Sequence, residues 1–249
     1  MIGTRLSHQV RLSPNVNERK GEKPVSILLL HYTGMKYAKA AADWLCAPES
    51  QVSSHYLIDE DGKIIQMVDE AARAWHAGVS SWRGDDDINS ISIGIEIQNR
   101  GHNLGYHDFA EAQTRQVVAL SKEIISRYDI PARNVLAHSD VAPDRKIDPG
   151  EKFDWKFLHK QGVGHFVEPE PVSGGSFLQE GDAGDPVMAL QAMLKLYGYG
   201  IEPTAIFDPK TRVVVAAFQR HFRPVRVDGI ADASTVTTLH KLLGRLPER

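Results

Sequence analysis

Two histidines and one aspartate have the types and positions that a metal site needs. His31 directly follows the apolar run 25–30, and His138 directly follows the apolar run 135–137. Asp148 comes ten residues after His138. Two imidazoles and one carboxylate match a catalytic zinc site, in which a fourth position stays open for water. Two buried histidines and an aspartate in a turn would give the same spacing, so both interpretations stay open.

Glu96 and Lys146 could supply the acid–base and electrostatic parts of a hydrolytic reaction. Isoleucine occupies every second position of 91–97, which predicts a strand with one apolar face and places Glu96 on the other face. There Glu96 could act as a general base toward water at the metal, or it could be a half-exposed strand residue. Lys146, two residues before Asp148, could stabilise an oxyanion, or it could be a surface lysine.

Most of the other histidines, and the motifs of several other enzyme classes, give no support for chemistry. His102 and His107 lie in a glycine-containing loop, where we expect them to be solvated. The chain has no HExxH helix, no GxSxG nucleophile elbow and no Gly-Lys-Ser/Thr phosphate loop. We assign no function to five histidines that lack supporting neighbours, namely His8, His159, His165, His221 and His240.

The elements that would position these residues alternate between strands and helices. They are, in chain order, a strand over 25–30, a helix over 38–45, a hairpin over 55–68, a strand over 91–97, a helix over 111–128 and a strand over 134–137. This alternation predicts an α/β fold in which helices flank a mixed central β-sheet.

A second, smaller domain follows a connector. The segment 168–176, EPEPVSGGS, combines prolines, acidic residues and glycines, which is typical of an extended, mobile linker. After it, apolar residues at helical spacing predict helices, two of which begin near Asp208 and Asp232. We therefore predict a catalytic domain over 1–167, a linker, and a small three-helix domain over 177–249.

Composition and charge exclude several other classes of protein. The 249 residues include 29 Lys and Arg against 32 Asp and Glu, and this balance argues against a nucleic-acid-binding surface. The single cysteine, Cys46, excludes an internal disulfide and a zinc site made mainly of thiolates. No apolar run is long enough to span a bilayer, and the first residues lack the apolar stretch of a signal peptide. We therefore expect a cytoplasmic protein as the sequence is written, or a periplasmic one if a leader has been removed.

Five sequence blocks carry a resemblance to a known family, and they run in order through about residues 25–165. The blocks are LLLHYTG, SSHYLIDEDGKIIQMV, RAWHAG, SIGIEIQN and AHSDVAPDRKIDPG. In these blocks the chain resembles the type-2 N-acetylmuramoyl-L-alanine amidases, and within that group the AmpD and AmiD enzymes of Gram-negative bacteria. The resemblance implies a mixed sheet with helices packed on it, in agreement with the fold predicted from the residues.

The resemblance also implies a reaction and a set of site residues. The reaction is hydrolysis of the amide between the lactyl group of N-acetylmuramic acid, in its ordinary or 1,6-anhydro form, and L-alanine of the peptidoglycan stem peptide. It implies that His31, His138 and Asp148 bind Zn²⁺ and that Glu96 and Lys146 are catalytic. Residues expected to contact sugar or peptide are His76 and Asn89, together with four that hairpin packing would explain equally well: His55, Arg73, Trp75 and Trp82.

The C-terminal part is similar to the helical peptidoglycan-binding module. Its three segments are DPVMALQAMLKLYGYG, FDPKTRVVVAAFQRHF and VDGIADASTVTTL. The module implies peptidoglycan or muropeptides as partners, because an anchor on a polymer raises the local concentration of the catalytic domain. We therefore expect removal of 168–249 to leave cleavage of small muropeptides intact.

The alternative function is a non-catalytic peptidoglycan receptor that uses the same cleft. The sequence leaves open whether the substrate is intact wall or soluble fragments, and it gives no oligomeric state.

Overall fold

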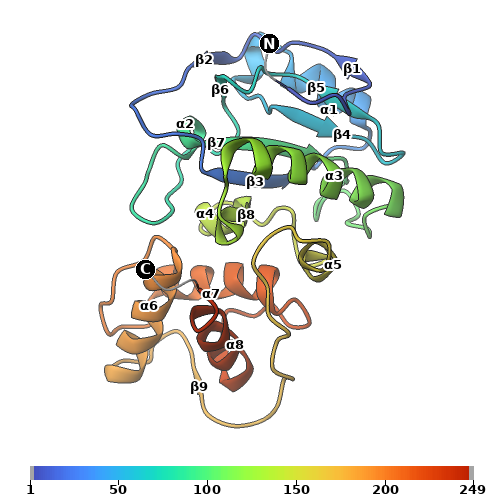
Figure 1. Ribbon diagram of the computed structural model, residues 1–249. Coiled ribbons are helices and arrows are strands. Elements are labelled where there is room, and N and C mark those ends of the chain that lie inside the picture. The colour runs from blue at the N-terminus through green and yellow to red at the C-terminus, as the bar shows by residue number, and fades with distance from the viewer. Residues whose placement is uncertain (1–2, 247–249) are drawn as a thin grey trace.

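The computed structural model describes residues 3–246, and two parts of the chain pack against each other in it (Figure 1). The first part is built on a six-stranded sheet with the order β1 (Gln9–Val10), β5 (Ile64–Gln66), β4 (Tyr56–Ile58), β7 (Ser92–Ile97), β3 (Ile27–Tyr32) and β8 (Val135–Ala137). The second part is helical and lies below the sheet in this view. The predicted fold class is thereby confirmed. Within residues 3–246, no helix is both long and apolar enough to cross a membrane.

The central strand β3 lies between two parallel neighbours, β7 and β8. It pairs in parallel with β7 on one side and with β8 on the other, and His31 lies opposite Glu96 in this register. On the far side of β7, β4 pairs in parallel with β7 and antiparallel with β5, so the predicted hairpin is present. Because β3, β7 and β8 run in the same direction, their carboxyl ends meet at one edge of the sheet.

Helices cover both faces of the sheet. The three isoleucines of β7 are fully buried and share the main core with the long helix α3 (Glu111–Tyr128), as their spacing predicts. On the other face, α1 (Ala38–Leu45) shares a separate apolar cluster with Leu57 and Met67. Glu96 alternates with the isoleucines and therefore lies on the face that is turned away from α3.

Several short elements are present that the sequence pattern does not predict. Runs of two to six residues show too little periodicity to identify a helix or a strand. One of them, α2 (Ile88–Ile91), ends where β7 begins and so shortens the strand predicted over 91–97. They also include the strand pair β2 (Val16–Glu18) and β6 (Ala72–Ala74), the helices α4 (His138–Val141) and α5 (Trp155–Lys160), and the 3-10 helices η1 (Pro48–Ser50) and η2 (Ala132–Asn134).

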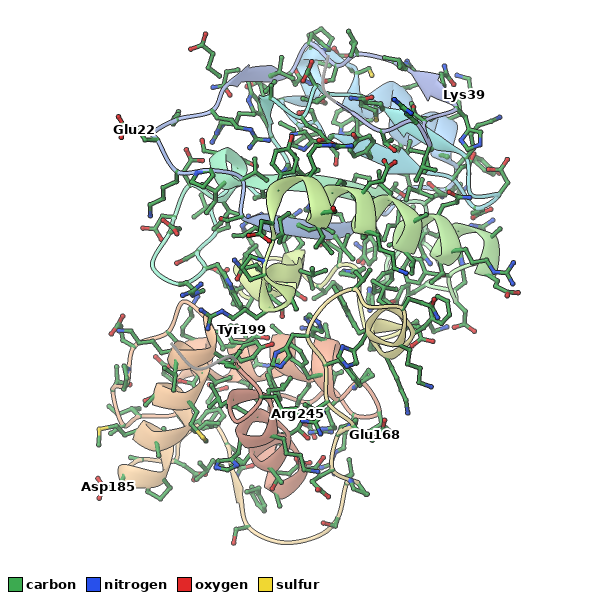
Figure 2. The ribbon with its side chains drawn as sticks, viewed as in Figure 1. Glu22, Lys39, Glu168, Asp185, Tyr199 and Arg245 are labelled. Carbon is green, nitrogen blue, oxygen red and sulfur yellow. The ribbon has the colours of Figure 1, made fainter. Side chains whose placement is uncertain are left out.

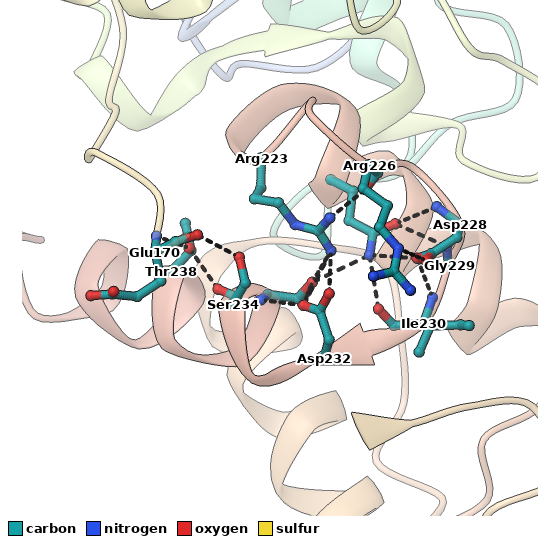
Figure 3. Close-up of polar contacts among 11 residues, drawn as sticks. Glu170, Arg223, Arg226, Asp228, Gly229, Ile230, Asp232, Ser234 and Thr238 are labelled. Carbon is teal, nitrogen blue, oxygen red and sulfur yellow. Dashed lines mark hydrogen bonds and ion pairs between the residues drawn. The ribbon is translucent and has the colours of Figure 1, made fainter. Parts of the chain in front are cut away.

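The C-terminal part contains three helices, α6 (Asp185–Tyr197), α7 (Pro209–Phe222) and α8 (Ala233–Leu243), together with the strand pair β9 (Phe177–Leu178) and β10 (Ala231–Asp232). The predicted starts of two helices are correct. Asp208 and Asp232 each accept a backbone N–H from the residue three positions later, at 2.7 and 2.8 Å, and so cap α7 and α8. Asp232 also accepts from the buried guanidinium of Arg223 (Figure 3).

The predicted linker 168–176 is docked over its first residues. The N–H of Glu170 donates to Thr238 Oγ1 at 3.1 Å, and the carbonyl of Glu170 accepts from Ser234 Oγ at 2.6 Å (Figure 3). Both partners belong to α8. Residues 171–176 are exposed. The boundaries of the two domains stay a prediction. The start of this connector is hydrogen-bonded to α8.

Candidate active site

Four of the predicted site residues come together at the carboxyl ends of the three parallel strands. His31 lies near the end of β3, Glu96 lies opposite it on β7, and His138 directly follows β8. Asp148 is held close by the backbone, because the N–H of Ser139 donates to the Asp148 carbonyl at 3.1 Å. The edge of the sheet therefore assembles residues that lie up to 117 positions apart in the chain.

His31, His138 and Asp148 form a compact buried group. These residues are 1 %, 3 % and 6 % exposed, respectively. His31 Nδ1 lies 2.9 Å from His138 Nδ1 and 3.2 Å from Asp148 Oδ2, and His138 Nδ1 lies 3.0 Å from the same carboxylate oxygen. Among residues 3–246, this is the group whose ligand atoms converge closely enough to hold a metal ion.

A chain of hydrogen bonds assigns the tautomer of His31. Ser92 Oγ donates to the carbonyl of Ile88 at 2.6 Å, so it accepts from His76 Nε2, which lies 3.2 Å away. The other nitrogen of His76, Nδ1, then accepts from His31 Nε2 at 3.0 Å. Burial lowers the pKa of His76 well below its usual value, and burial and the neighbouring His138 lower the pKa of His31 to about 4, so both rings are neutral at pH 7. His31 therefore turns an unprotonated Nδ1 toward the group.

His138 also turns its Nδ1 toward the group. Its Nε2 donates to the carbonyl of Ala77 at 3.1 Å. Two histidine nitrogens and a carboxylate oxygen thus face one another at hydrogen-bonding distance. A cation would be bound by all three atoms, and histidines that donate their second nitrogen to protein acceptors are typical of metal sites. The residues present therefore fit a metal ion.

Glu96 lies beside this group with an unused oxygen. Its Oε2 is buried and has no hydrogen-bond partner among the described residues. Burial, and next the charge of Asp148, raise the pKa of Glu96 well above its usual value, while Lys146 opposes the shift. A carboxylate with a raised pKa and a free oxygen can take up a proton near neutral pH.

A cleft of about 530 Å³ opens onto these residues. Its lining includes His31, His138 and Asp148, which we call the metal group. It also includes Glu96, His76, and the predicted residues Lys146 and Trp75. Apolar side chains of α1, together with Val52 in the loop that precedes β4, form an apolar wall of the cleft, in which Trp44 is half exposed. The cleft thus combines a polar end and an apolar wall, as a site for an amphipathic ligand does.

Two family matches divide the chain. Residues 21–151 match the family described as N-acetylmuramoyl-L-alanine amidase, and residues 183–239 match a peptidoglycan binding domain. The chain belongs to the N-acetylmuramoyl-L-alanine amidase family. Together with the buried metal group, this confirms the predicted enzyme class and the predicted resemblance of the C-terminal part.

Sequence relatives of this amidase agree with that assignment. The chain is 38 % identical over 234 residues to N-acetylmuramoyl-L-alanine amidase AmiD of Escherichia coli K12. This alignment covers 88 % of this chain and 82 % of the relative. The chain is also 36 % identical over 160 residues to 1,6-anhydro-N-acetylmuramyl-L-alanine amidase AmpD of Citrobacter freundii. This second alignment covers 57 % of this chain and 83 % of the relative.

Solved structures are similar along nearly the whole amidase chain. The complex of E. coli AmiD with anhydro-N-acetylmuramic acid-L-Ala-D-γ-Glu-L-Lys has a TM-score of 0.76 at 35 % identity and covers 92 % of each chain. AmpDh3 of Pseudomonas aeruginosa has a TM-score of 0.75 at 31 % identity and covers 93 % of this chain and 96 % of that one. The arrangement of both parts of the chain is therefore shared with these enzymes.

Three predicted contact residues of the amidase do not line this cleft, and each of them has a structural partner. Asn89 Oδ1 accepts from the backbone N–H groups of His76 and Ala77, at 3.0 and 2.8 Å, and so holds the segment that carries His76. Arg73 forms an ion pair with Asp87 at 2.7 Å. His55 is fully buried, and its Nδ1 accepts from the Gly94 N–H at 3.0 Å. For Arg73 and His55 these contacts agree with the packing alternative that the sequence left open, and a role in substrate binding stays a prediction.

The structure also changes what is expected of three other aromatic residues. His76 reaches the cleft, but its ring nitrogens are engaged by His31 and Ser92. Trp75 lines the cleft and donates to Asn17 Oδ1 at 2.9 Å. Trp82 is buried and packs against Tyr197 and Tyr199 of the C-terminal part.

Arg145 and Trp44 are among the cleft residues that the sequence reasoning missed. Arg145 lines the cleft and donates its Nε to the carbonyl of Val79 at 2.8 Å. Trp44 belongs to the helix predicted over 38–45 and was given no functional role. It lies outside the buried face of α1 and is 49 % exposed, so only the fold identifies it as a cleft residue.

His55 provides a prediction about stability that is independent of the metal. Burial, and next the charge of Arg19, lower the pKa of His55 to about 3 in the folded protein. The unfolded chain, with a pKa of about 6.5, therefore binds more protons between these values. The contribution of His55 to stability is complete above about pH 6.5 and is lost as the pH falls toward 3.

We expect the His55→Asn variant to lose less stability on acidification than the wild type. At pH 5 the difference between the two losses should be about 2 kcal/mol, since each pKa unit corresponds to about 1.4 kcal/mol. Urea unfolding of metal-free protein at neutral pH and at pH 5 measures it, with the exposed His240→Asn as control. Parallel losses in wild type and variant would show that His55 is not held neutral.

Proposed function

We propose that this chain is a zinc-dependent amidase that hydrolyses the bond between the lactyl group of N-acetylmuramic acid and L-alanine. One observation carries the proposal: three buried ligand atoms converge beside Oε2 of Glu96, which has no hydrogen-bond partner among the described residues. His31, His138 and Asp148 would hold the ion. When bound there, zinc supplies a Lewis acid that polarises the scissile carbonyl and lowers the pKa of water.

The side chains of the cleft would perform the proton transfers. Glu96 accepts a proton from the attacking water and returns it to the amine of the leaving L-alanine. Its raised pKa suits both transfers near neutral pH, because the group must first take up the proton and then release it. His76 accepts a hydrogen bond from His31 Nε2 and so positions a proposed ligand of the metal.

Lys146 would stabilise the oxyanion that forms at the scissile carbonyl. It lies in the cleft lining two residues before Asp148. We expect Lys146→Met to lower kcat by about 10²–10³-fold, because the loss of one oxyanion donor has this effect in other hydrolases. Metal content, measured by elemental analysis, should stay that of the wild type. Lys122→Met, an exposed position on α3, is the control, and an unchanged kcat in Lys146→Met would remove the role.

We propose muropeptides with a 1,6-anhydro sugar as substrates. The solved AmiD complex holds anhydro-N-acetylmuramic acid with a tripeptide, and AmpDh3 was solved with anhydromuramic pentapeptide. Both relatives align along more than nine-tenths of this chain. The apolar wall of the cleft and the indole of Trp75 would contact the ligand, while the C-terminal domain would bind peptidoglycan itself.

Mass spectrometry of reaction products tests the proposed function. Soluble anhydromuropeptides and insoluble sacculi are each incubated with zinc-loaded protein and with chelator-treated protein. We expect free stem peptides only from the zinc-loaded protein, and the preferred substrate distinguishes fragment recycling from wall remodelling. If folded, zinc-loaded protein releases no peptide from either substrate but still binds sacculi, the non-catalytic receptor is the correct function.

A further inference from the structure

Asp140 connects the metal group to the C-terminal helices. It lies in α4, two residues after His138, and its carboxylate is completely buried. Asp140 Oδ2 accepts from the backbone N–H of Ala137 at 2.8 Å and from His221 Nδ1 at 2.7 Å, and its Oδ1 accepts from the Tyr199 hydroxyl at 2.7 Å. We call these four residues the Asp140 network. Two of the three donors come from the C-terminal part of the chain.

The two C-terminal donors are themselves fixed in place. The ring of His221, on α7, lies 3.7 Å from the ring of Trp155 on α5 and 3.8 Å from that of Phe222, stacked on both. Tyr199 packs edge-on against Trp82, with ring centroids 5.2 Å apart. It follows α6 at the junction between the two parts of the chain, where Figure 2 labels it. Both side chains are at most 2 % exposed.

The hydrogen bond at the start of α4 closes the turn that contains His138. It joins the N–H of Ala137 to the carboxylate of Asp140, so His138 and Ser139 lie between its two ends. The N–H of Ser139 in turn holds the carbonyl of Asp148. The backbone of two members of the metal group therefore depends on the position of one buried carboxylate.

We propose that the C-terminal helices position His138 through the Asp140 network, and so form part of the support of the metal site. This rests on the proposed function, because it takes His138 as a ligand. A buried carboxylate that loses two of its three donors must recruit water or move, and either change releases the turn. The C-terminal part is then more than an anchor, and we no longer expect its removal to leave the cleavage of small muropeptides intact.

The test removes the two C-terminal donors while keeping the ring packing. The double variant Tyr199→Phe/His221→Phe retains both aromatic stacks and lacks both hydrogen bonds to Asp140. Tyr197→Phe is the matched control, since Tyr197 is buried in the same interface and its hydroxyl bonds to His165 Nδ1 at 2.9 Å instead. The zinc dissociation constant is measured by competition with a chelator, and the visible spectrum of the cobalt-substituted protein reports ligand geometry.

We expect the double variant to bind zinc about 10–100-fold more weakly than the control, as happens when partners of metal ligands are lost. Its cobalt spectrum should change, whereas that of Tyr197→Phe should match the wild type. Equal zinc affinity and equal spectra in the double variant and the control would overturn the inference. A wild-type chain that binds no metal would instead overturn the proposed function. If the double variant fails to fold, Tyr199→Phe alone gives the same comparison with a smaller change.

Discussion

Glu96→Gln is expected to lower kcat by about 10²–10⁴-fold and to leave metal binding unchanged. General acid–base catalysis contributes a factor of this size, and an amide oxygen cannot take the proton from water. Glu96 lies next to the metal group without belonging to it: its register partner is His31, but its Oε2 has no partner among residues 3–246. Glutamine has the same shape, so packing on β7 should be preserved.

Steady-state kinetics on a soluble anhydromuropeptide and zinc analysis of the same samples measure this effect. The exposed Glu49→Gln controls for the change in charge. Loss of zinc together with activity would show that Glu96 supports the metal site. Activity close to that of the wild type would mean that another group accepts the proton.

Asp148→Ala should abolish both metal binding and hydrolysis. The carboxylate supplies the negative charge of the group, and its Oδ2 lies within 3.2 Å of both histidine nitrogens. Its removal leaves two imidazoles, which hold zinc far less firmly than a three-ligand site. We expect the zinc affinity to fall by more than the ~10–100-fold that follows the loss of a residue that only supports a ligand.

Asp144→Ala is the matched control, because Asp144 is an exposed carboxylate in the same loop. Competition with a chelator gives the zinc dissociation constants, and product analysis gives the residual activity. Stoichiometric zinc in Asp148→Ala would show that the ion is held elsewhere. Full activity after chelation of the wild type would contradict metal dependence altogether.

The sequence alone was sufficient for the features that rest on local periodicity and on strand ends. Alternating isoleucines identified β7 and the face of Glu96, and helical spacing gave α3 with its bounds. His31 and His138 were recognised because each directly follows an apolar strand. In a parallel sheet such positions meet at one edge, so this part of the site could be predicted without knowing the order of the strands.

Only the tertiary structure revealed which polar side chains serve the site and which serve the fold. His55 and His76 both come from polar segments near the same hairpin, yet one is buried against Gly94 and the other holds His31. His221 lacks any informative neighbour in the sequence, but it pairs with Asp140, 81 positions away. Hydrogen bonds between distant segments form only when the chain folds, so the spacing of residues within one segment does not predict them. The sequence therefore identified the candidate ligands, and the packing of the two parts determined the contacts that surround them.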